Sequence, residues 1–146
     1  MRNIFTKLIN GEKKSFSKTP LNLLVVEDDE SLVEVLNELF SELGYVSTVL
    51  DKTDDIVPLM EKVKPDLVLL DYLLPHINGG ELCSQIKNHK LFSATPVIIF
   101  SAFSKVLISL GDYGCDAFIE KPFNLSELIT KIERLSAIHS QRYKTE

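Results

Sequence analysis

The sequence lacks the patterns that mark zinc-binding, disulfide-rich and membrane-spanning proteins. Its two cysteines, Cys83 and Cys115, lie 32 positions apart, with no CxxC motif and no histidine at metal-ligand spacing. No apolar run approaches the roughly 18 residues of a membrane-spanning helix, and residues 1–10 hold no apolar stretch long enough for a signal peptide. We therefore expect reduced thiols, no transmembrane segment and a cytoplasmic location.

Positive charge is scarce beyond residue 20. The chain has a net charge of −5, and residues 1–20 hold five basic residues and one acidic residue, which leaves −9 on the rest. Nucleic-acid-binding domains need clustered lysine and arginine, so we expect no direct contact with nucleic acid. Residues 1–20 combine charge and helix breakers without periodicity, which is typical of a flexible basic extension. A short helix that docks on a membrane or a partner is the alternative.

Four apolar runs are present, and each leads into a residue with useful chemistry. Leu23 to Val26 leads into Glu27-Asp28-Asp29, and Leu67 to Leu70 leads into Asp71. Val97 to Phe100 leads into Ser101, and Ala117 to Glu120 leads into Lys121. If the runs are parallel strands, these residues share one edge of a sheet, where ligands bind in open α/β folds. Carboxylates, a hydroxyl and an amine gathered there suit a hard cation and a phosphoryl group.

Helical patterns alternate with the strands along the chain. We expect strands at residues 23–26, 46–50, 66–70, 97–100 and 117–120, and helices at residues 32–43, 54–64, 81–88, 102–110 and 125–135. Continuous apolar runs are typical of parallel strands that are covered on both faces. The order predicts one α/β domain with a doubly wound, five-stranded parallel sheet and five helices, arranged as a three-layer sandwich.

Capping residues set the expected helix ends. We expect Asp29 or Ser31 to cap the first helix and Gly44 to end it. Pro58 is tolerated only in a first turn, so we place the cap of a short second helix at Asp55. The last helix has a capping pair, since Asn124 is followed three positions later by a glutamate.

The acidic strand ends predict a metal site. Carboxylates about 4 Å apart repel each other by roughly 1 kcal/mol in water and by more at lower dielectric, and a divalent cation relieves this repulsion. Oxygen ligands favour magnesium, calcium or manganese. Asp71 is then a candidate nucleophile toward phosphorus, and Ser101 and Lys121 are candidates for contacts to phosphoryl oxygens.

Together these segments resemble the receiver domain of two-component response regulators over roughly residues 21–140. The matching segments are Leu-Leu-Val-Val-Glu-Asp-Asp-Glu at 23–30, Pro-Asp-Leu-Val-Leu-Leu-Asp-Tyr-Leu-Leu-Pro at 65–75, Pro-Val-Ile-Ile-Phe-Ser-Ala at 96–102 and Glu-Lys-Pro-Phe at 120–123. The resemblance implies a flavodoxin-like fold with strand order 2-1-3-4-5. Residues 141–146 would form a C-terminal tail.

The resemblance also implies the chemistry of the site. Asp71 would be the phosphoacceptor, loaded from a phosphohistidine on a sensor histidine kinase or a histidine phosphotransfer protein. Glu27, Asp28, Asp71 and the backbone carbonyl of Leu73 would bind Mg²⁺, with Mn²⁺ or Ca²⁺ as substitutes. No other cofactor is implied.

Other matching residues imply how the signal is relayed. Ser101 and Lys121 would sense the phosphoryl group, and Phe118 would be the aromatic switch that reports it to the face formed by the fourth helix, fifth strand and fifth helix. The chain would be a single-domain response regulator in phosphorelay signal transduction, which assists its own phosphorylation and dephosphorylation but is not an enzyme. Its partners would be a phosphodonor and an unidentified downstream protein, and it would form a weak homodimer.

Three positions depart from the family pattern. Asn78 replaces the usual aspartate, which changes only local turn bonding, and Phe118 replaces the common tyrosine, so switching must rely on ring burial without a hydroxyl. The spacing of 20 from Ser101 to Lys121 is shorter than in most receivers. We therefore expect a truncated fourth helix or preceding loop, and no standard dimer through that face.

Other functions fit the same architecture less well. A flavin-binding domain needs a loop that accepts the anionic flavin phosphate, and Glu27-Asp28-Asp29 repels it. A haloacid-dehalogenase-like phosphatase needs an aspartate two residues after the nucleophile, where this chain has Leu73. The main alternative is a receiver-like adaptor that binds partners without being phosphorylated, and the presence of all five site residues argues against it.

Overall fold

Five parallel strands form one sheet, and their order confirms the predicted doubly wound fold. The structure is a computed structural model that describes residues 20–102 and 113–144. The sheet order is β2-β1-β3-β4-β5. The strands are β1 (Asn22–Val26), β2 (Val46–Leu50), β3 (Leu67–Asp71), β4 (Val97–Ser101) and β5 (Ala117–Glu120).

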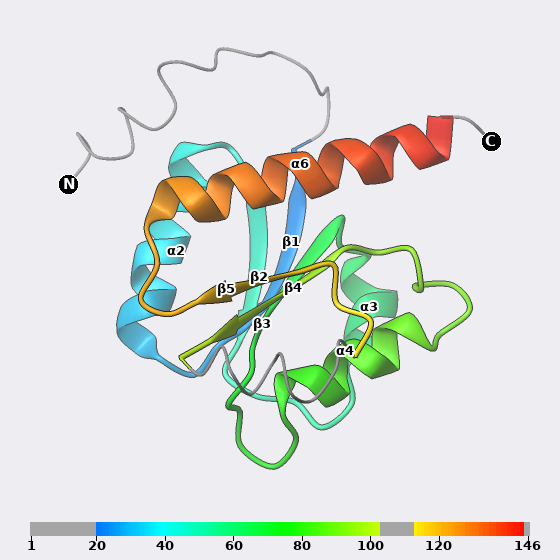
Figure 1. Cartoon of the computed structure of the whole chain (residues 1–146), viewed down its shortest axis with the longest axis horizontal. Coiled ribbons are helices and arrows are strands. Elements are labelled where there is room, and N and C mark those ends of the chain that lie inside the picture. Colours follow the sequence, from blue (N-terminus) through cyan, green and yellow to red (C-terminus); the bar gives the residue numbers. More distant parts are fainter. Residues whose placement is uncertain (1–19, 103–112, 145–146) are drawn as a thin grey trace.

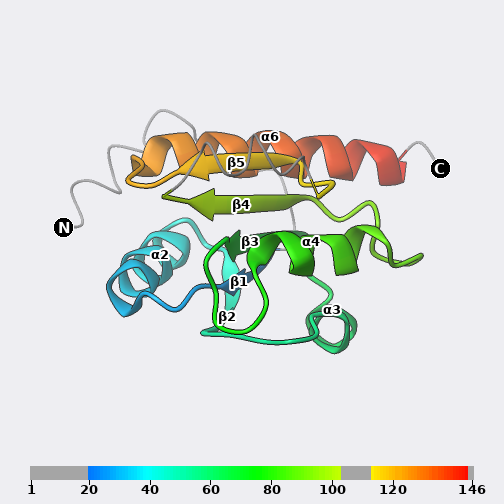
Figure 2. The ribbon, with the colours of Figure 1, turned by 60° about the horizontal axis from the view of Figure 1, so that its bottom comes forward.

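Helices cover both faces of the sheet (Figures 1 and 2). The described residues contain four helices, which are α2 (Glu30–Glu42), α3 (Val57–Val63), α4 (Gly79–Lys87) and α6 (Leu125–Lys144). Helices α2 and α6 pack on one face, and α3 and α4 pack on the other. The fifth helix predicted at 102–110, and the truncation expected there, fall almost entirely on residues 103–112, outside the described residues. Residues 1–19 of the basic extension predicted at 1–20 also lie outside them.

Each central strand contributes to two hydrophobic cores. Leu23 and Val25 of β1 pack in the core beneath α2 and α6, whereas Leu24 and Val26 pack in the core beneath α3 and α4. All four side chains are fully buried. Successive strand residues point to opposite faces, so a strand buried on both sides must be apolar throughout. This explains why the central strands β1, β3 and β4 appear in the sequence as nearly unbroken apolar runs.

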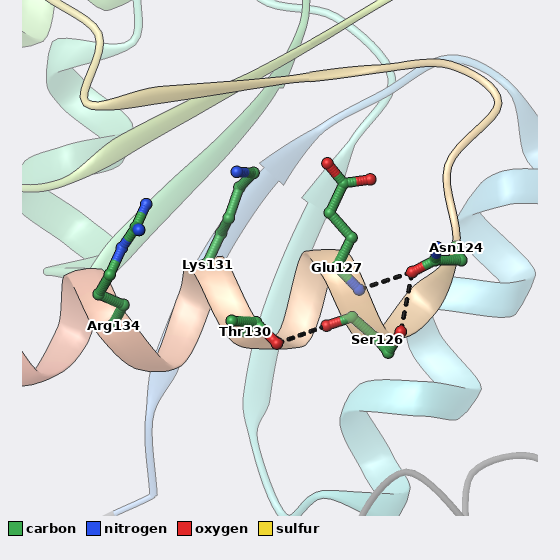
Figure 3. Close-up of a pocket in the computed structure, with 6 residues that line it drawn as sticks. All are labelled: Asn124, Ser126, Glu127, Thr130, Lys131 and Arg134. Atoms are coloured by element: carbon green, nitrogen blue, oxygen red, sulfur yellow. Dashed lines mark hydrogen bonds between the residues drawn. The ribbon is translucent and has the colours of Figure 1, made fainter.

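Two predicted helix caps are confirmed. The Asp29 carboxylate accepts hydrogen bonds from the backbone amides of Ser31 and Leu32 at 3.0 and 3.3 Å, so Asp29 rather than Ser31 caps α2. The Asn124 side chain accepts from the Glu127 amide at 2.8 Å (Figure 3). Side-chain oxygens at these positions satisfy amides that have no partner within the helix.

Three predicted helix boundaries are wrong. The cap of α3 is Ile56 and not Asp55, although the Asp55 carboxylate still accepts from the Val57 amide at 3.0 Å. Helix α4 begins at Gly79, two residues before the predicted start, because Asn78 caps it. Helix α6 continues to Lys144, beyond the predicted apolar stripe. Among the described residues, no helix combines the length and apolar character of a membrane span.

Gly79 allows the start of α4 to pack directly on the end of β3. Its amide donates to the carbonyl of Tyr72 at 2.9 Å. A Cβ atom at this position would collide with the backbone carbonyl oxygen of Asp71. The glycine is therefore required by close backbone approach, and it ties α4 to the strand that carries Asp71.

We predict that Gly79→Ala lowers the free energy of unfolding by about 1–3 kcal/mol, because the added methyl group forces α4 away from β3. Urea denaturation followed by circular dichroism measures this change. Ser84→Ala, in the interior of the same helix, is the control and is expected to change stability little. A Gly79→Ala variant as stable as the wild type would contradict the close packing.

Candidate functional site

The four polar strand ends meet at one edge of the sheet. Asp71 and Ser101 are the last residues of β3 and β4, while Glu27 and Lys121 directly follow β1 and β5. Parallel pairing aligns these ends, since Asp71 is in register with Phe100 and Ser101 with Glu120. The arrowheads of β4 and β5 point the same way in Figure 2. The predicted assembly of these residues is therefore present.

Lys121 lies between two buried carboxylates. Its Nζ atom is 2.7 Å from Glu27 Oε1 and 3.2 Å from Asp71 Oδ1. Glu27 is 1% exposed and Asp71 is 7% exposed. Glu27 also accepts a hydrogen bond through Oε2 from the Asp29 amide at 3.2 Å. Ion pairs with this degree of burial are screened little by solvent, so the ammonium group offsets much of the repulsion between the two acids.

Three carboxylates are close enough to share a metal ion. Glu27, Asp28 and Asp71 each offer an oxygen, and these atoms lie within 4.8 Å of one another. Asp28 is exposed, so the cluster is open to solvent on one side. Oxygen-only donors fit a hard divalent cation better than a soft metal. Three carboxylates facing one ammonium leave a net negative charge, which favours binding of such a cation.

Electrostatic effects on the ionisable groups follow from this crowding. The pKa of Asp71 is raised to about 6, first by burial and then by the charge of Glu27, while Lys121 opposes this shift. Burial by itself lowers the pKa of Lys121, but the hydrogen bond with Glu27 and the two carboxylates outweigh burial and raise that pKa above its ordinary value. The site therefore holds a firmly protonated amine beside a carboxylate whose ionised form is disfavoured.

The remaining predicted site residues lie around this cluster. Ser101 is buried, and its backbone carbonyl accepts from the Lys121 amide at 2.8 Å. Phe118 of β5 is 42% exposed, and the side chain of Leu73, two residues after Asp71, is 56% exposed. Their predicted roles as switch and backbone ligand remain predictions.

An aromatic support for Lys121 was missed in the sequence. The Phe100 ring lies 5.9 Å from Lys121 Nζ, and it stacks on Phe123 with ring centroids 5.1 Å apart and planes 3° from parallel. A cation over an aromatic face is attracted by the ring. The available signal was that Phe100 precedes Ser101 and Phe123 follows Lys121-Pro122, so both rings had to lie near the site.

Comparison with known proteins identifies the family. The family model described as the response regulator receiver domain matches residues 23–133. The chain belongs to this family.

The receiver domain is similar to named response regulators. Response regulator ArlR of Staphylococcus saprophyticus is 38% identical over an alignment of 118 residues, and the match covers 77% of this chain and 51% of that protein. ArlR of Staphylococcus aureus strain Mu50 is 36% identical over 116 residues, with 77% and 51% covered. This chain therefore spans about half the length of these relatives.

Solved structures agree with this assignment. The response regulator TrrA of Thermotoga maritima, in complex with Mg²⁺-BeF, matches with a TM-score of 0.71 and 29% identity, over 79% of this chain and 98% of that one. The receiver domain of Francisella response regulator 1452 matches with a TM-score of 0.70 and 28% identity, over 82% and 98%. The receiver fold and its signalling family are thus shown by both sequence and structure.

A surface hollow on α6 is distinct from the carboxylate cluster. It encloses about 400 Å³ and is lined by Asn124, Ser126, Glu127, Thr130, Lys131 and Arg134. Figure 3 shows that all six side chains come from the first turns of α6 and its cap. No strand end contributes to its lining, so it is not the site at which the predicted functional residues meet.

The raised pKa of Asp71 predicts that its charge destabilises the receiver domain when no divalent cation is present. The folded-state pKa of about 6 lies above the ordinary value of 3.8, so the contribution of Asp71 to stability is most favourable at low pH and becomes less favourable as the pH rises from about 4 through 6. We expect Asp71→Asn to be more stable than the wild type at pH 7.5 by about 1–3 kcal/mol. Urea denaturation in EDTA at pH 4 and pH 7.5 tests this prediction, and equal stability of the two proteins at pH 7.5 would contradict it.

Proposed function

We propose that this receiver domain accepts a phosphoryl group on Asp71 from a phosphohistidine and changes conformation in response. The observation that carries the proposal is the assembly of Asp71 with two further carboxylates and the Lys121 ammonium at the carboxyl edge of the sheet. In phosphoryl transfer a protein mainly positions groups and neutralises charge. These side chains provide both functions.

The transfer step uses one oxygen of Asp71 as the nucleophile. This oxygen forms a bond to phosphorus while the bond between phosphorus and the donor imidazole nitrogen breaks. The products are an aspartyl phosphate and a neutral histidine, whose nitrogen takes up a proton. The Lys121 ammonium, already paired with Asp71, would bind the phosphoryl oxygens, and the Ser101 hydroxyl would donate to them.

The carboxylate cluster fits Mg²⁺, with Mn²⁺ or Ca²⁺ as substitutes. Glu27, Asp28, Asp71 and the backbone carbonyl of Leu73 would hold the ion. A bound divalent cation neutralises the charge of the approaching phosphoryl group and its acceptor. The hard donor set, the net negative charge of the cluster and the raised pKa of Asp71 support this assignment. TrrA, a structural relative, was solved with Mg²⁺ and beryllofluoride.

Ser101, Lys121 and Phe118 would convert phosphorylation into a signal. We propose that Ser101 and Lys121 contact the phosphoryl group and that the partly exposed Phe118 ring changes its position in β5. The output is then a conformational state, not a released product, so the domain is not an enzyme in the usual sense. Its proposed partners are a sensor histidine kinase or phosphotransfer protein and a downstream protein, in the cytoplasm.

We propose residues 21–140 as the receiver domain, with residues 1–20 as a basic extension and residues 141–146 as a tail that begins within the last turn of α6. The family match over residues 23–133 supports the boundaries of the central unit.

We predict that acetyl phosphate adds one phosphoryl group to the wild type only when Mg²⁺ is present, because the carboxylate cluster otherwise repels the donor. Intact-mass measurement with Mg²⁺ and with EDTA tests this prediction. Asp71→Asn is the matched control, since it keeps the shape of the side chain but removes the nucleophile, and it is expected to remain unmodified.

Two outcomes would count against the proposal. A phosphoryl group on Asp71→Asn would place the acceptor at another residue, such as Asp28. No adduct on the wild type, together with no spectral change on adding beryllofluoride, would favour the adaptor that binds partners without phosphorylation.

We predict that Lys121→Ala still becomes phosphorylated, but about 100-fold more slowly, because one charged donor to the phosphoryl group is lost. Its conformational response is expected to be smaller, as measured by amide chemical shifts of β5 after addition of beryllofluoride. Lys62→Ala, on the exposed side of α3, controls for loss of a positive charge. A wild-type rate and response in Lys121→Ala would remove Lys121 from the mechanism.

A further inference from the structure

Two tyrosines beside the site have no part in the proposed chemistry. Tyr72 directly follows Asp71 and is 7% exposed, and Tyr113 lies before β5. Their ring centroids are 6.5 Å apart with planes tilted by 51°. A hydrogen bond joins their side chains. The pair links the residue that follows the acceptor strand to a residue 41 positions later in the chain.

Tyr113 also contacts the first turn of α4. A Cβ atom built on Gly80 would lie 2.5 Å from Cε2 and 2.6 Å from Cδ2 of the Tyr113 ring. The ring therefore fills the space that a side chain at position 80 would take. Tyr113 packs against the core that includes Tyr72 and Leu82.

These contacts hold both ends of the loop at residues 72–79 in place. At its start, the Tyr72 amide donates to the Phe100 carbonyl at 2.8 Å, and the Tyr72 side chain contacts Tyr113. At its end, Gly79 donates to the Tyr72 carbonyl at 2.9 Å, and Tyr113 covers Gly80. The Tyr113 side chain therefore contacts Tyr72 at the start of the loop and Gly80 just after its end. The loop contains Leu73, the proposed backbone ligand of the metal.

We propose that Tyr113 is a positioning residue for the divalent cation. Tyr113 packs against Tyr72 and Gly80 and so keeps the two ends of the loop together. This packing fixes the position of the Leu73 carbonyl relative to the carboxylates of Glu27 and Asp71. This inference rests on the proposed function, because it concerns the same metal site. Supporting residues that do not touch a metal commonly change its affinity by about 10- to 100-fold when they are removed.

A tyrosine on the opposite face of the sheet provides a matched control. Tyr45 is half-buried, and its ring lies 5.9 Å from that of Phe40 in the core beneath α2 and α6. Tyr45→Ala removes the same side chain from a core that does not contain the loop at residues 72–79. If Tyr113 only fills space, the two substitutions lower stability and leave metal affinity alone.

The experiment measures the Mg²⁺ dissociation constant by calorimetry and the melting temperature for each variant. Tyr113→Ala is expected to weaken Mg²⁺ binding about tenfold. Tyr113→Phe keeps the ring and is expected to bind Mg²⁺ nearly as tightly as the wild type. Tyr45→Ala is expected to melt at a lower temperature with the wild-type dissociation constant. Should Tyr113→Ala fail to fold, Tyr113→Leu keeps apolar volume but cannot reach both Tyr72 and Gly80, and it is expected to show the same loss.

Gly80→Ala tests the contact from the other side. In the wild type the added methyl group displaces the Tyr113 ring, so Mg²⁺ binding is expected to weaken. In the Tyr113→Ala background the methyl group has room, so no further loss is expected.

Two results would overturn the inference in different ways. If the wild type binds Mg²⁺ but Tyr113→Ala binds it equally tightly, Tyr113 only packs the core and the proposed function stands. If the wild type itself does not bind Mg²⁺, the metal part of the proposed function is wrong, and the inference falls with it.

Discussion

The structure of the site depends on the contact of Lys121 with Glu27 and Asp71. At about 4 Å two carboxylates repel by roughly 1 kcal/mol in water and by about 4 kcal/mol at an effective dielectric constant of 20. Lys121 offsets this repulsion at 2.7 and 3.2 Å but cannot balance three acids. The fold therefore maintains an excess of negative charge, and the same excess makes the edge receptive to a divalent cation. Phosphoryl acceptance on Asp71 would use that cation to bring an anionic donor to an anionic acceptor.

The elements around this contact hold its members in place. Glu27, Asp71 and Ser101 sit at or next to the ends of strands whose pairing is fixed by burial on both faces, because a slip of one residue would turn the side chains to the wrong side. Phe100 and Phe123 support the Lys121 amine, and Gly79 brings α4 against the backbone of Asp71. Sites built on rigid elements keep their geometry better than sites carried by loops. The loop at residues 72–79 is the exception, and the contacts of Tyr113 at its two ends hold it in place.

The sequence predicts the sheet and the site well for a physical reason that they share. The central strands are unbroken apolar runs, and Asp71, Ser101 and Lys121 each stand at the end of a strand or directly after it, so parallel pairing alone brings these three residues together. The start of α3 is less predictable, because a tertiary contact takes part in it. The Ile56 amide at the start of α3 donates to Gln85 of α4 at 2.9 Å, a contact that no local pattern reveals. The contact of Tyr113 with Gly80 is hidden for the same reason, since only the fold brings the two positions together.

The most direct test of this account is to locate the phosphoryl group by chemical trapping. After reaction with acetyl phosphate and Mg²⁺, sodium borohydride reduces an aspartyl phosphate to homoserine, and peptide mass spectrometry identifies the converted residue. We predict conversion at Asp71 alone, with none at Asp28 or Asp29 and none when Mg²⁺ is replaced by EDTA. Conversion at another aspartate, or full conversion of Asp71 in EDTA, would contradict the claim that the fold prepares Asp71 as a cation-dependent acceptor.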